Sequence, residues 1–239
     1  MGYEALATTS AGLAFSRGLM EGLVPHDGVL DHCREIVEAT NLPVSADLEK
    51  GFGDSPEEVA RTIRAAAATG LAGCSIEDHT NRRDDPIFDF GLTVERIQAA
   101  VEAKNALQDD FILTARAENL LWGHMDLDET IRRLQAFDTA GTDVLYAPGL
   151  RDLDSIRAVC SSVDKSVNVV MGMTGTTFTL EELAKAGVKR VSVGSALYRA
   201  AFAGFHIAAV EMMKQGTFTF ADQAMDFAAI ENNFIGYDP

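Results

Sequence analysis

The chain has 239 residues, a formal net charge of −16 at pH 7 and 47% apolar residues. This apolar content can build a large core, whereas the acidity argues against nucleic-acid binding, which needs a basic patch. No apolar run approaches the roughly 18–20 residues that span a bilayer, and the N-terminus lacks a signal-peptide pattern, so we expect no membrane partner. Cys33, Cys74 and Cys160 lie far apart, which is typical of reduced thiols in a cytoplasmic protein.

Short apolar runs that alternate with longer amphipathic segments predict strands that alternate with helices. The clearest helix starts at Ser55, a capping hydroxyl followed by Pro56, and should reach residue 70; Thr179 opens another through a capping box with Glu182. Residues 11–18 are expected to form a loop. The expected strands end near Ser10, Glu49, Glu77, Arg116, Ala147, Met171 and Val193. The other expected helices cover residues 30–39, 94–107, 128–140, 153–163, 197–215 and 220–234.

This alternation predicts the α/β class and a single domain over residues 1–239 with a parallel sheet. The length is close to the roughly 250 residues of a TIM-type (β/α)8 barrel, which is the fold we expect. Only seven strands are predicted, so either the barrel closes in an unusual way or its first strand is missing from this chain. A doubly wound open sheet is the alternative, although no GxGxxG segment follows a first strand.

Polar side chains gather where the expected strands end, and that end of a barrel carries the active site. Asp47 and Glu49 are two residues apart on an expected strand, so they should face the same side. Together with Glu77 they could supply the oxygen ligands that Mg²⁺ prefers, and Arg116 could bind a substrate carboxylate through two parallel hydrogen bonds.

Four motifs occur in order along the chain: TTSAG at 8–12, DLEKGFG at 47–53, GCSIED at 73–78 and TARAE at 114–118. Together they resemble motifs of the isocitrate lyase/phosphoenolpyruvate mutase superfamily, including its metal-binding DxDxGYG segment. The segments around Glu21, Asn168 and Ser192 are similar to further parts of that family. The chain is therefore identified as a member of the 2-methylisocitrate lyase-like or carboxyvinyl-carboxyphosphonate phosphorylmutase-like type.

The resemblance implies a cofactor, Mg²⁺ or alternatively Mn²⁺, with Asp47 as its direct ligand and Glu21, Glu49 and Glu77 as holders of its water ligands. It implies catalytic roles for Arg116, Glu118 and Asn81. It also implies that a small carboxylate substrate is bound by Thr9, Ser10, Ala11, Arg116 and Asn168.

The implied reaction is carbon–carbon cleavage or decarboxylation of a 2-oxo or 2-hydroxy acid through an enolate that the metal stabilises. The KKCGH loop of the lyases is absent, because residues 79–86 read HTNRRDDP and contain no cysteine. Phosphorus–carbon chemistry, as in phosphoenolpyruvate mutase or phosphonopyruvate hydrolase, and a catalytically weak 2-oxo acid binding protein are the alternatives. A Schiff-base aldolase would need a lysine inside a strand, and Lys50 lies past the carboxylates.

Residues 197–239 are expected to form C-terminal helices that are rich in alanine and aromatic residues. In the family such helices exchange between subunits, so the resemblance implies a homo-oligomer, with a tetramer as the expected state.

Overall fold

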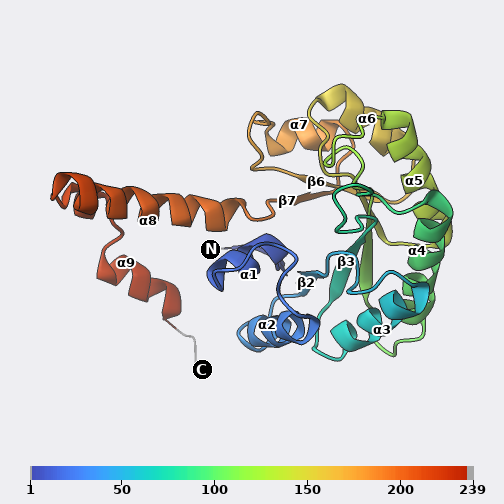
Figure 1. The fold of residues 1–239 in the computed structure, drawn as a ribbon, viewed down its shortest axis with the longest axis horizontal. Helices are drawn as coiled ribbons and strands as arrows, with labels where there is room; N and C mark the ends of the chain where they lie inside the picture. Colours follow the sequence, from blue (N-terminus) through green and yellow to red (C-terminus); the bar gives the residue numbers. More distant parts are fainter. Residues whose placement is uncertain (1, 236–239) are drawn as a thin grey trace.

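The computed structural model describes residues 2–235, which form a parallel sheet surrounded by helices, with one long helix that leaves the sheet (Figure 1). Residues 1 and 236–239, which belong to the predicted domain and to the predicted C-terminal helices, lie outside the described residues. The strands are β1 (Leu6–Ala7), β2 (Val44–Asp47), β3 (Gly73–Glu77), β4 (Ile112–Arg116), β5 (Val144–Tyr146), β6 (Ser166–Val170) and β7 (Arg190–Ser192).

The seven strands pair in the order in which they occur in the chain, and every pair is parallel. A doubly wound sheet would reverse its strand order at a switch point, so the consecutive order excludes that alternative. The sheet curls into a nearly closed barrel, and within residues 2–235 no ladder joins β7 to β1. The predicted α/β class and TIM-type fold are confirmed.

The register brings one polar residue from each of five strands to the same level of the barrel. Glu77 pairs with Arg116, Arg116 with Tyr146, Tyr146 with Asn168, and Asn168 with Arg190. Paired residues of parallel neighbours point to the same side of a sheet. These side chains therefore form one polar layer, which a core of aliphatic residues on the other face of the sheet supports.

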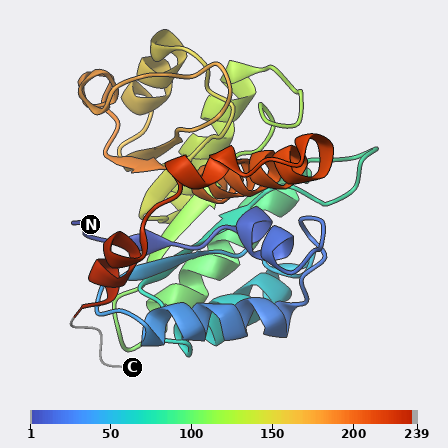
Figure 2. The same cartoon turned by 90° about the vertical axis from the view of Figure 1, so that its left-hand side faces the viewer.

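Most of the helices that connect the strands cover the outside of the barrel (Figure 2). Both predicted capping boxes are present, with Ser55 and Glu58 at the start of α3 and Thr179 and Glu182 at the start of α7. The helices are α1 (Ser10–Ser16), α2 (His26–Glu38), α3 (Pro56–Ala67), α4 (Phe90–Asn105), α5 (Leu127–Ala140), α6 (Leu153–Ser161), α7 (Leu180–Lys185), α8 (Ala196–Gln215) and α9 (Phe227–Glu231). The 3-10 helices are η1 (Thr219–Gln223) and η2 (Asn232–Phe234).

Three local predictions were wrong. Residues 11–18 do not form a loop, because Thr9 caps helix α1 by accepting a hydrogen bond from the Gly12 amide. Strand β2 ends at Asp47, and Glu49 has a φ of 51°, so the two carboxylates do not lie on one extended strand. The helix predicted over residues 220–234 is broken, because Ala224 is extended and Asp226 caps a new helix, α9.

Helix α8 extends away from the barrel, and α9 turns back from its far end (Figure 1). None of the residues of α8 is buried, although it carries large apolar side chains such as Phe202, Phe205 and Ile207. In residues 2–235, no helix combines the length and the apolar character needed to cross a membrane.

A methyl group at Gly73 should destabilise the barrel, because a Cβ there would lie 2.3 Å from the Ile112 carbonyl oxygen of the neighbouring strand. We expect Gly73→Ala to lower the free energy of unfolding by about 2 kcal/mol or more, as overpacking of a core does. The control is Gly204→Ala in α8, where nothing lies within 4 Å of the added Cβ. It should be neutral or stabilise by up to about 1 kcal/mol, since alanine favours a helix. Urea denaturation checks both values, and equal stability of the two variants would contradict the predicted packing.

Candidate active site

Asp47 lies at the carboxyl end of β2 and accepts hydrogen bonds from the first turn of α1. Its Oδ2 accepts from the Ser10 amide at 3.2 Å and from the Ser10 hydroxyl at 2.9 Å. The same hydroxyl lies 2.8 Å from Glu21 Oε1, and the Thr8 hydroxyl accepts from the Asp47 amide at 2.9 Å. The TTSAG segment thus holds the carboxylate through the N-terminus of a helix, where negative charge is favoured.

Arg116, at the end of β4, lies among three carboxylates. Its Nη1 is 3.1 Å from Asp47 Oδ1, its Nη2 is 3.1 Å from Glu77 Oε2, and its Nε donates to Glu118 Oε1 at 2.7 Å. The Tyr146 ring lies against the guanidinium, with its centroid 4.9 Å from Cζ. These contacts use three of the five donors of a guanidinium, so two N–H groups remain for a ligand.

The carboxylates outnumber the cations at this site. Burial, together with the charges of Asp47 and Glu21, raises the pKa of Glu49 to about 7. Burial also raises the pKa of Glu118 to about 7 and that of Glu77 well above its ordinary value, although Arg116 opposes both shifts. A cation beside these groups would favour their charged forms.

Asn81 approaches the site from the loop after β3. The Asn81 amide partly offsets the rise in the pKa of Glu49 and opposes the fall in the pKa of His79. The His79 ring is buried, stacks on the Trp122 ring at a centroid distance of 3.8 Å and has Nδ1 3.8 Å from Glu77 Oε1. Burial lowers the pKa of His79 to about 4, so the imidazole is neutral near pH 7.

A cavity of about 410 Å³ lies inside the barrel beside the polar layer. Thr9, Asp47, Arg116 and Asn168 line it, so four of the predicted site residues face one space. Asn168 is 2% exposed and donates to the Ser192 hydroxyl at 3.0 Å, while its Oδ1 has no hydrogen-bond partner among the described residues. An orphaned buried acceptor is costly unless a ligand or water satisfies it.

The remaining predicted residues join this group by contact and do not line the cavity. Ser10, Glu21, Glu77 and Glu118 each bond to a residue of the cluster, and the Glu49 amide donates to Asp47 Oδ1 at 3.3 Å. Asn81 Nδ2 and Glu49 Oε2 both lie beside Gly22. Ala11 is buried in the first turn of α1 and presents no side-chain group beyond its methyl.

The donor set fits a hard cation that keeps most of its water ligands. Within residues 2–235, no three His, Cys, Asp or Glu side chains stand close enough to ligate one ion directly. Mg²⁺ usually binds through one or two carboxylates and retains several waters. Asp47 as the direct ligand, with Glu21, Glu49 and Glu77 around it, is compatible with that mode.

Tyr146 and Arg190 are among the residues that line the cavity and that sequence reasoning missed. Arg190 Nη1 donates to the Thr114 hydroxyl at 3.1 Å across the barrel, and no carboxylate pairs with it among residues 2–235. Both residues lie in short strands without a recognisable motif. Only the pairing of the strands shows that they lie at the same level of the barrel as Arg116.

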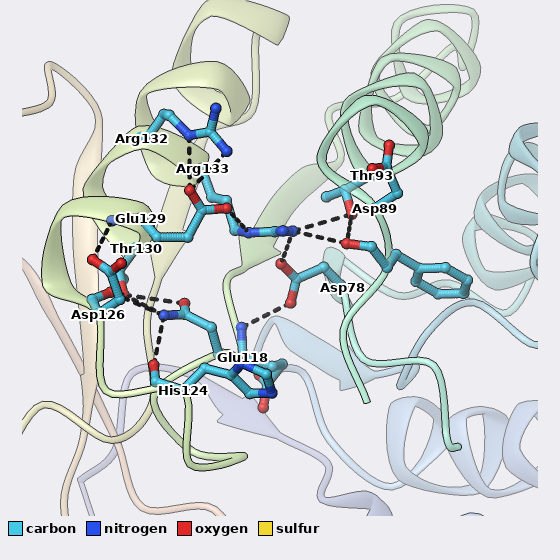
Figure 3. Close-up of polar contacts among 12 residues, drawn as sticks. Asp78, Asp89, Thr93, Glu118, His124, Asp126, Glu129, Thr130, Arg132 and Arg133 are labelled. Carbon is cyan, nitrogen blue, oxygen red and sulfur yellow. Dashed lines mark hydrogen bonds and ion pairs between the residues drawn. The ribbon is translucent and has the colours of Figure 1, made fainter. Parts of the chain in front are cut away.

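Behind the site, Asp78 fixes the main chain from which Glu118 projects (Figure 3). Its Oδ1 accepts from the Glu118 amide at 2.8 Å, and its Oδ2 pairs with Arg133 Nη1 at 3.0 Å. Arg133 also donates to the Phe88 carbonyl at 3.1 Å and to Glu129 Oε1 at 2.9 Å. Asp78 is 1% exposed, so its bond with the Glu118 amide links the ends of β3 and β4 inside the protein, while its ion pair with Arg133 ties them to α5.

Arg96 stabilises the turn that follows Asp47 and Glu49 by hydrogen bonds to its main chain. This buried arginine donates to the carbonyls of Gly53 at 2.8 Å and Asp54 at 2.6 Å, and also to that of Lys50. Its guanidinium lies 4.2 Å from the centroid of the Phe88 ring.

Comparisons with known proteins show the family to which the chain belongs. A family model described as phosphoenolpyruvate phosphomutase matches residues 1–213. The 2-methylisocitrate lyase of Escherichia coli (strain K12) is 32% identical over 209 residues, which cover 83% of this chain and 69% of that protein. A crystal structure from Burkholderia cenocepacia J2315, named provisionally as a lyase/mutase, is 55% identical with a TM-score of 0.96, covering 99% of this chain and 86% of that one. Oxaloacetate acetylhydrolase in complex with the product oxalate has a TM-score of 0.86 and 26% identity, covering 98% and 83%.

Removal of the Arg133 guanidinium should destabilise the fold strongly, because Asp78 would remain buried without its partner. We expect Arg133→Met to lower the free energy of unfolding by about 3–5 kcal/mol, measured by urea denaturation. The matched control is Arg132→Met. Arg132 also pairs with Glu129, but its side chain is 58% exposed, so this substitution should lower the free energy of unfolding by about 1 kcal/mol or less. Similar losses in both variants would refute the structural role of the Asp78–Arg133 pair.

Proposed function

Because the chain belongs to the isocitrate lyase/phosphoenolpyruvate mutase superfamily, we propose that it is a Mg²⁺-dependent lyase or decarboxylase of a small 2-oxo or 2-hydroxy carboxylate. The observation that carries this proposal is the cluster of Asp47, Glu77 and Glu118 around Arg116, beside a cavity inside the barrel. The names of the relatives support the class of reaction, since they include a 2-methylisocitrate lyase and an oxaloacetate acetylhydrolase.

In this proposal Asp47 is the direct ligand of Mg²⁺ (or Mn²⁺), and Glu21, Glu49 and Glu77 hold its waters. The bound ion would supply the positive charge that stabilises an enolate oxygen. Ser10 holds Asp47 Oδ2 through its amide and hydroxyl, and Arg116 Nη1 lies 3.1 Å from Oδ1, so an ion at Asp47 would share these oxygens with the existing contacts.

The substrate would lie in the cavity, in contact with Thr9, Arg116 and Asn168. The two unused N–H donors of Arg116 can bind a carboxylate oxygen, and the free Oδ1 of Asn168 can accept a hydrogen bond from a 2-hydroxyl. Ser10 and Ala11 would contact the substrate through the first turn of α1, with the backbone donor supplied by Ala11 because the Ser10 amide donates to Asp47.

Three residues are proposed for catalysis. Arg116 would offset negative charge that develops on the substrate, and Glu118 would orient it through the 2.7 Å bond to Nε. Asn81 would act as a hydrogen-bond donor at Glu49, since an amide does not exchange a proton in catalysis at neutral pH.

Phosphorus–carbon chemistry is the second candidate, and the match of residues 1–213 to a phosphoenolpyruvate phosphomutase model favours it. The lack of a cysteine in residues 79–86 is compatible with this reaction and also with a weak 2-oxo acid binding protein. A direct comparison of substrates separates these functions.

We further propose a homo-oligomer, a tetramer, in which α8 and α9 pack on a neighbouring subunit. The support is the exposure of apolar side chains along a helix that leaves the barrel, among them Phe202 at 54% and Phe205 at 69% (Figure 1). A cytoplasmic location is proposed from Cys33, Cys74 and Cys160, which are all free thiols.

Turnover should depend on Asp47 and on a divalent ion. We expect Asp47→Asn to lower kcat/KM at least about 100-fold, because the direct charge on the ion is lost, and excess EDTA to abolish the activity of the unaltered protein until Mg²⁺ is restored. Activity would be measured as release of pyruvate, glyoxylate or oxalate. Unchanged turnover after both treatments would sink the metal-dependent mechanism.

A panel of acids identifies the reaction. Oxaloacetate, 2-methylisocitrate, isocitrate and phosphonopyruvate, each with Mg²⁺, should give carbon–carbon cleavage of at least one of the first three. Phosphate release from phosphonopyruvate alone would favour the second candidate. Binding without turnover of any of them would favour the binding protein.

Sedimentation velocity at micromolar concentration should show a tetramer. Phe202→Asp and Phe205→Asp should shift it toward smaller species, because a charge would enter an apolar interface. A monomer for the unaltered protein would refute the proposed assembly.

A further inference from the structure

Arg190, on β7, has fewer partners than the other arginines that lie inside the protein. Its Nη1 donates to the Thr114 hydroxyl at 3.1 Å, and its side chain makes no further hydrogen bond or ion pair within the described part of the chain. By contrast, Arg116 meets three carboxylates, Arg133 pairs with a buried aspartate and Arg96 binds three carbonyls. A guanidinium has five N–H donors, so four of those of Arg190 are left for a ligand.

The Arg190 guanidinium lies inside the cavity. Arg190 lines this space of about 410 Å³ from β7 and reaches across it to Thr114 on β4. Thr114 and Arg116 are two residues apart on β4, so their side chains point to the same side of the sheet. The two guanidinium groups are therefore reached from one space, with that of Arg190 further from the carboxyl ends of the strands. Burial lowers the pKa of Arg190, but a guanidinium stays charged at neutral pH.

The charge of Arg190 is the unbalanced charge of the cavity lining. Asp47 supplies a carboxylate to this lining, and Arg116 and Arg190 supply guanidinium groups. Asp47 and Arg116 pair with each other at 3.1 Å, and the other lining residues are neutral. Although the whole chain carries a net charge of −16, this part of the cavity is positive. It can therefore accept an anionic group away from the carboxylate cluster.

An unsatisfied acceptor faces the same space from the neighbouring strand. Asn168 pairs with Arg190 in the register of β6 and β7, and its buried Oδ1 has no hydrogen-bond partner among residues 2–235. Burial of a charge without a partner and of an acceptor without a donor both cost free energy. A ligand that carries a hydroxyl and a carboxylate would satisfy the two groups together.

We propose that Arg190 is a specificity-determining residue that binds a second carboxylate of the substrate, so that the site prefers dicarboxylic to monocarboxylic acids. This inference rests on the proposed function, which puts a 2-oxo or 2-hydroxy acid in the cavity. The reacting end of the acid lies at Asp47 and Arg116, and its far carboxylate lies at Arg190. The free donors of a guanidinium suit this group, because they bind a carboxylate through two parallel hydrogen bonds.

The test measures binding by isothermal titration calorimetry in the presence of Mg²⁺. Malate and 2-hydroxybutanoate differ only at the far end, where malate has a carboxylate and 2-hydroxybutanoate a methyl group. We expect the unaltered protein to bind malate about 10- to 100-fold more tightly, as a hydrogen-bonded charge pair contributes. Arg190→Met should weaken malate binding by a similar factor and leave the binding of 2-hydroxybutanoate nearly unchanged. Arg190→Lys should keep part of the preference, since it retains the charge and loses the planar fork.

Two comparisons separate a role in binding from a role in folding. Arg190→Met should leave Tm nearly unchanged, because no buried carboxylate loses its partner, whereas Arg133→Met should lower it. Arg157→Met removes a guanidinium from an exposed pair with Asp154 in α6, and it should change the affinity for neither acid.

Equal affinity of the unaltered protein for the two acids would overturn the proposal, as would an absence of malate binding or an undiminished preference in Arg190→Met. A fall in Tm as large as that of Arg133→Met would also overturn it, because Arg190 would then be a structural residue. Calorimetry needs no turnover, so the two proposals fail separately. Preference for malate through Arg190 without turnover of any acid in the panel refutes the lyase reaction alone, and turnover without that preference refutes the role of Arg190 alone.

Discussion

The Arg116 guanidinium and its three carboxylates are the interaction on which the site depends. Asp47, Glu77 and Glu118 come from different segments of the chain, and like charges this close would repel one another without a cation between them. Burial raises the pKa of Glu77 and that of Glu118, and the charge of Arg116 opposes both shifts. The barrel therefore presents an oxygen-rich, negatively charged pocket that is organised before any ligand arrives.

A second layer of buried arginines keeps this group in place. Arg133 neutralises Asp78, the residue after Glu77, and Arg96 binds the carbonyls of the turn that follows Asp47. Each guanidinium joins a helix on the outside of the barrel to a segment that follows a strand: Arg96 in α4 contacts the turn after β2, and Arg133 in α5 contacts Asp78 after β3. The cost of burying these charges is offset because their partners satisfy several N–H donors at once. The loops that carry the carboxylates of the site are therefore held by arginine side chains that do not line the cavity.

Helix α1 and the loop after β3 contribute the remaining residues of the site. Ser10 links Asp47 to Glu21, whereas Asn81 and Glu49 both reach the space beside Gly22. These contacts come from short polar segments with unusual backbone conformations, including the left-handed residues Glu49 and Asn81. Such conformations persist where surrounding contacts over-determine them, and they are common at functional sites.

The sequence by itself determined the parallel barrel, both capping boxes and the identity of the carboxylates at the strand ends, because periodicity, helix caps and short motifs are local signals. It did not determine that Glu49 leaves the strand, that Thr9 starts a helix or that Tyr146 and Arg190 face the cavity. Those features depend on register between strands and on contacts between residues far apart in the chain, which no local pattern encodes. The DLEKGFG and GCSIED segments identify the acidic residues of the site. Only the tertiary structure shows that Arg116 lies between them and that Lys50 and Arg82 both pair with Asp54. The physical reason is that electrostatic and packing interactions act through space, between residues that only the folded sheet brings together.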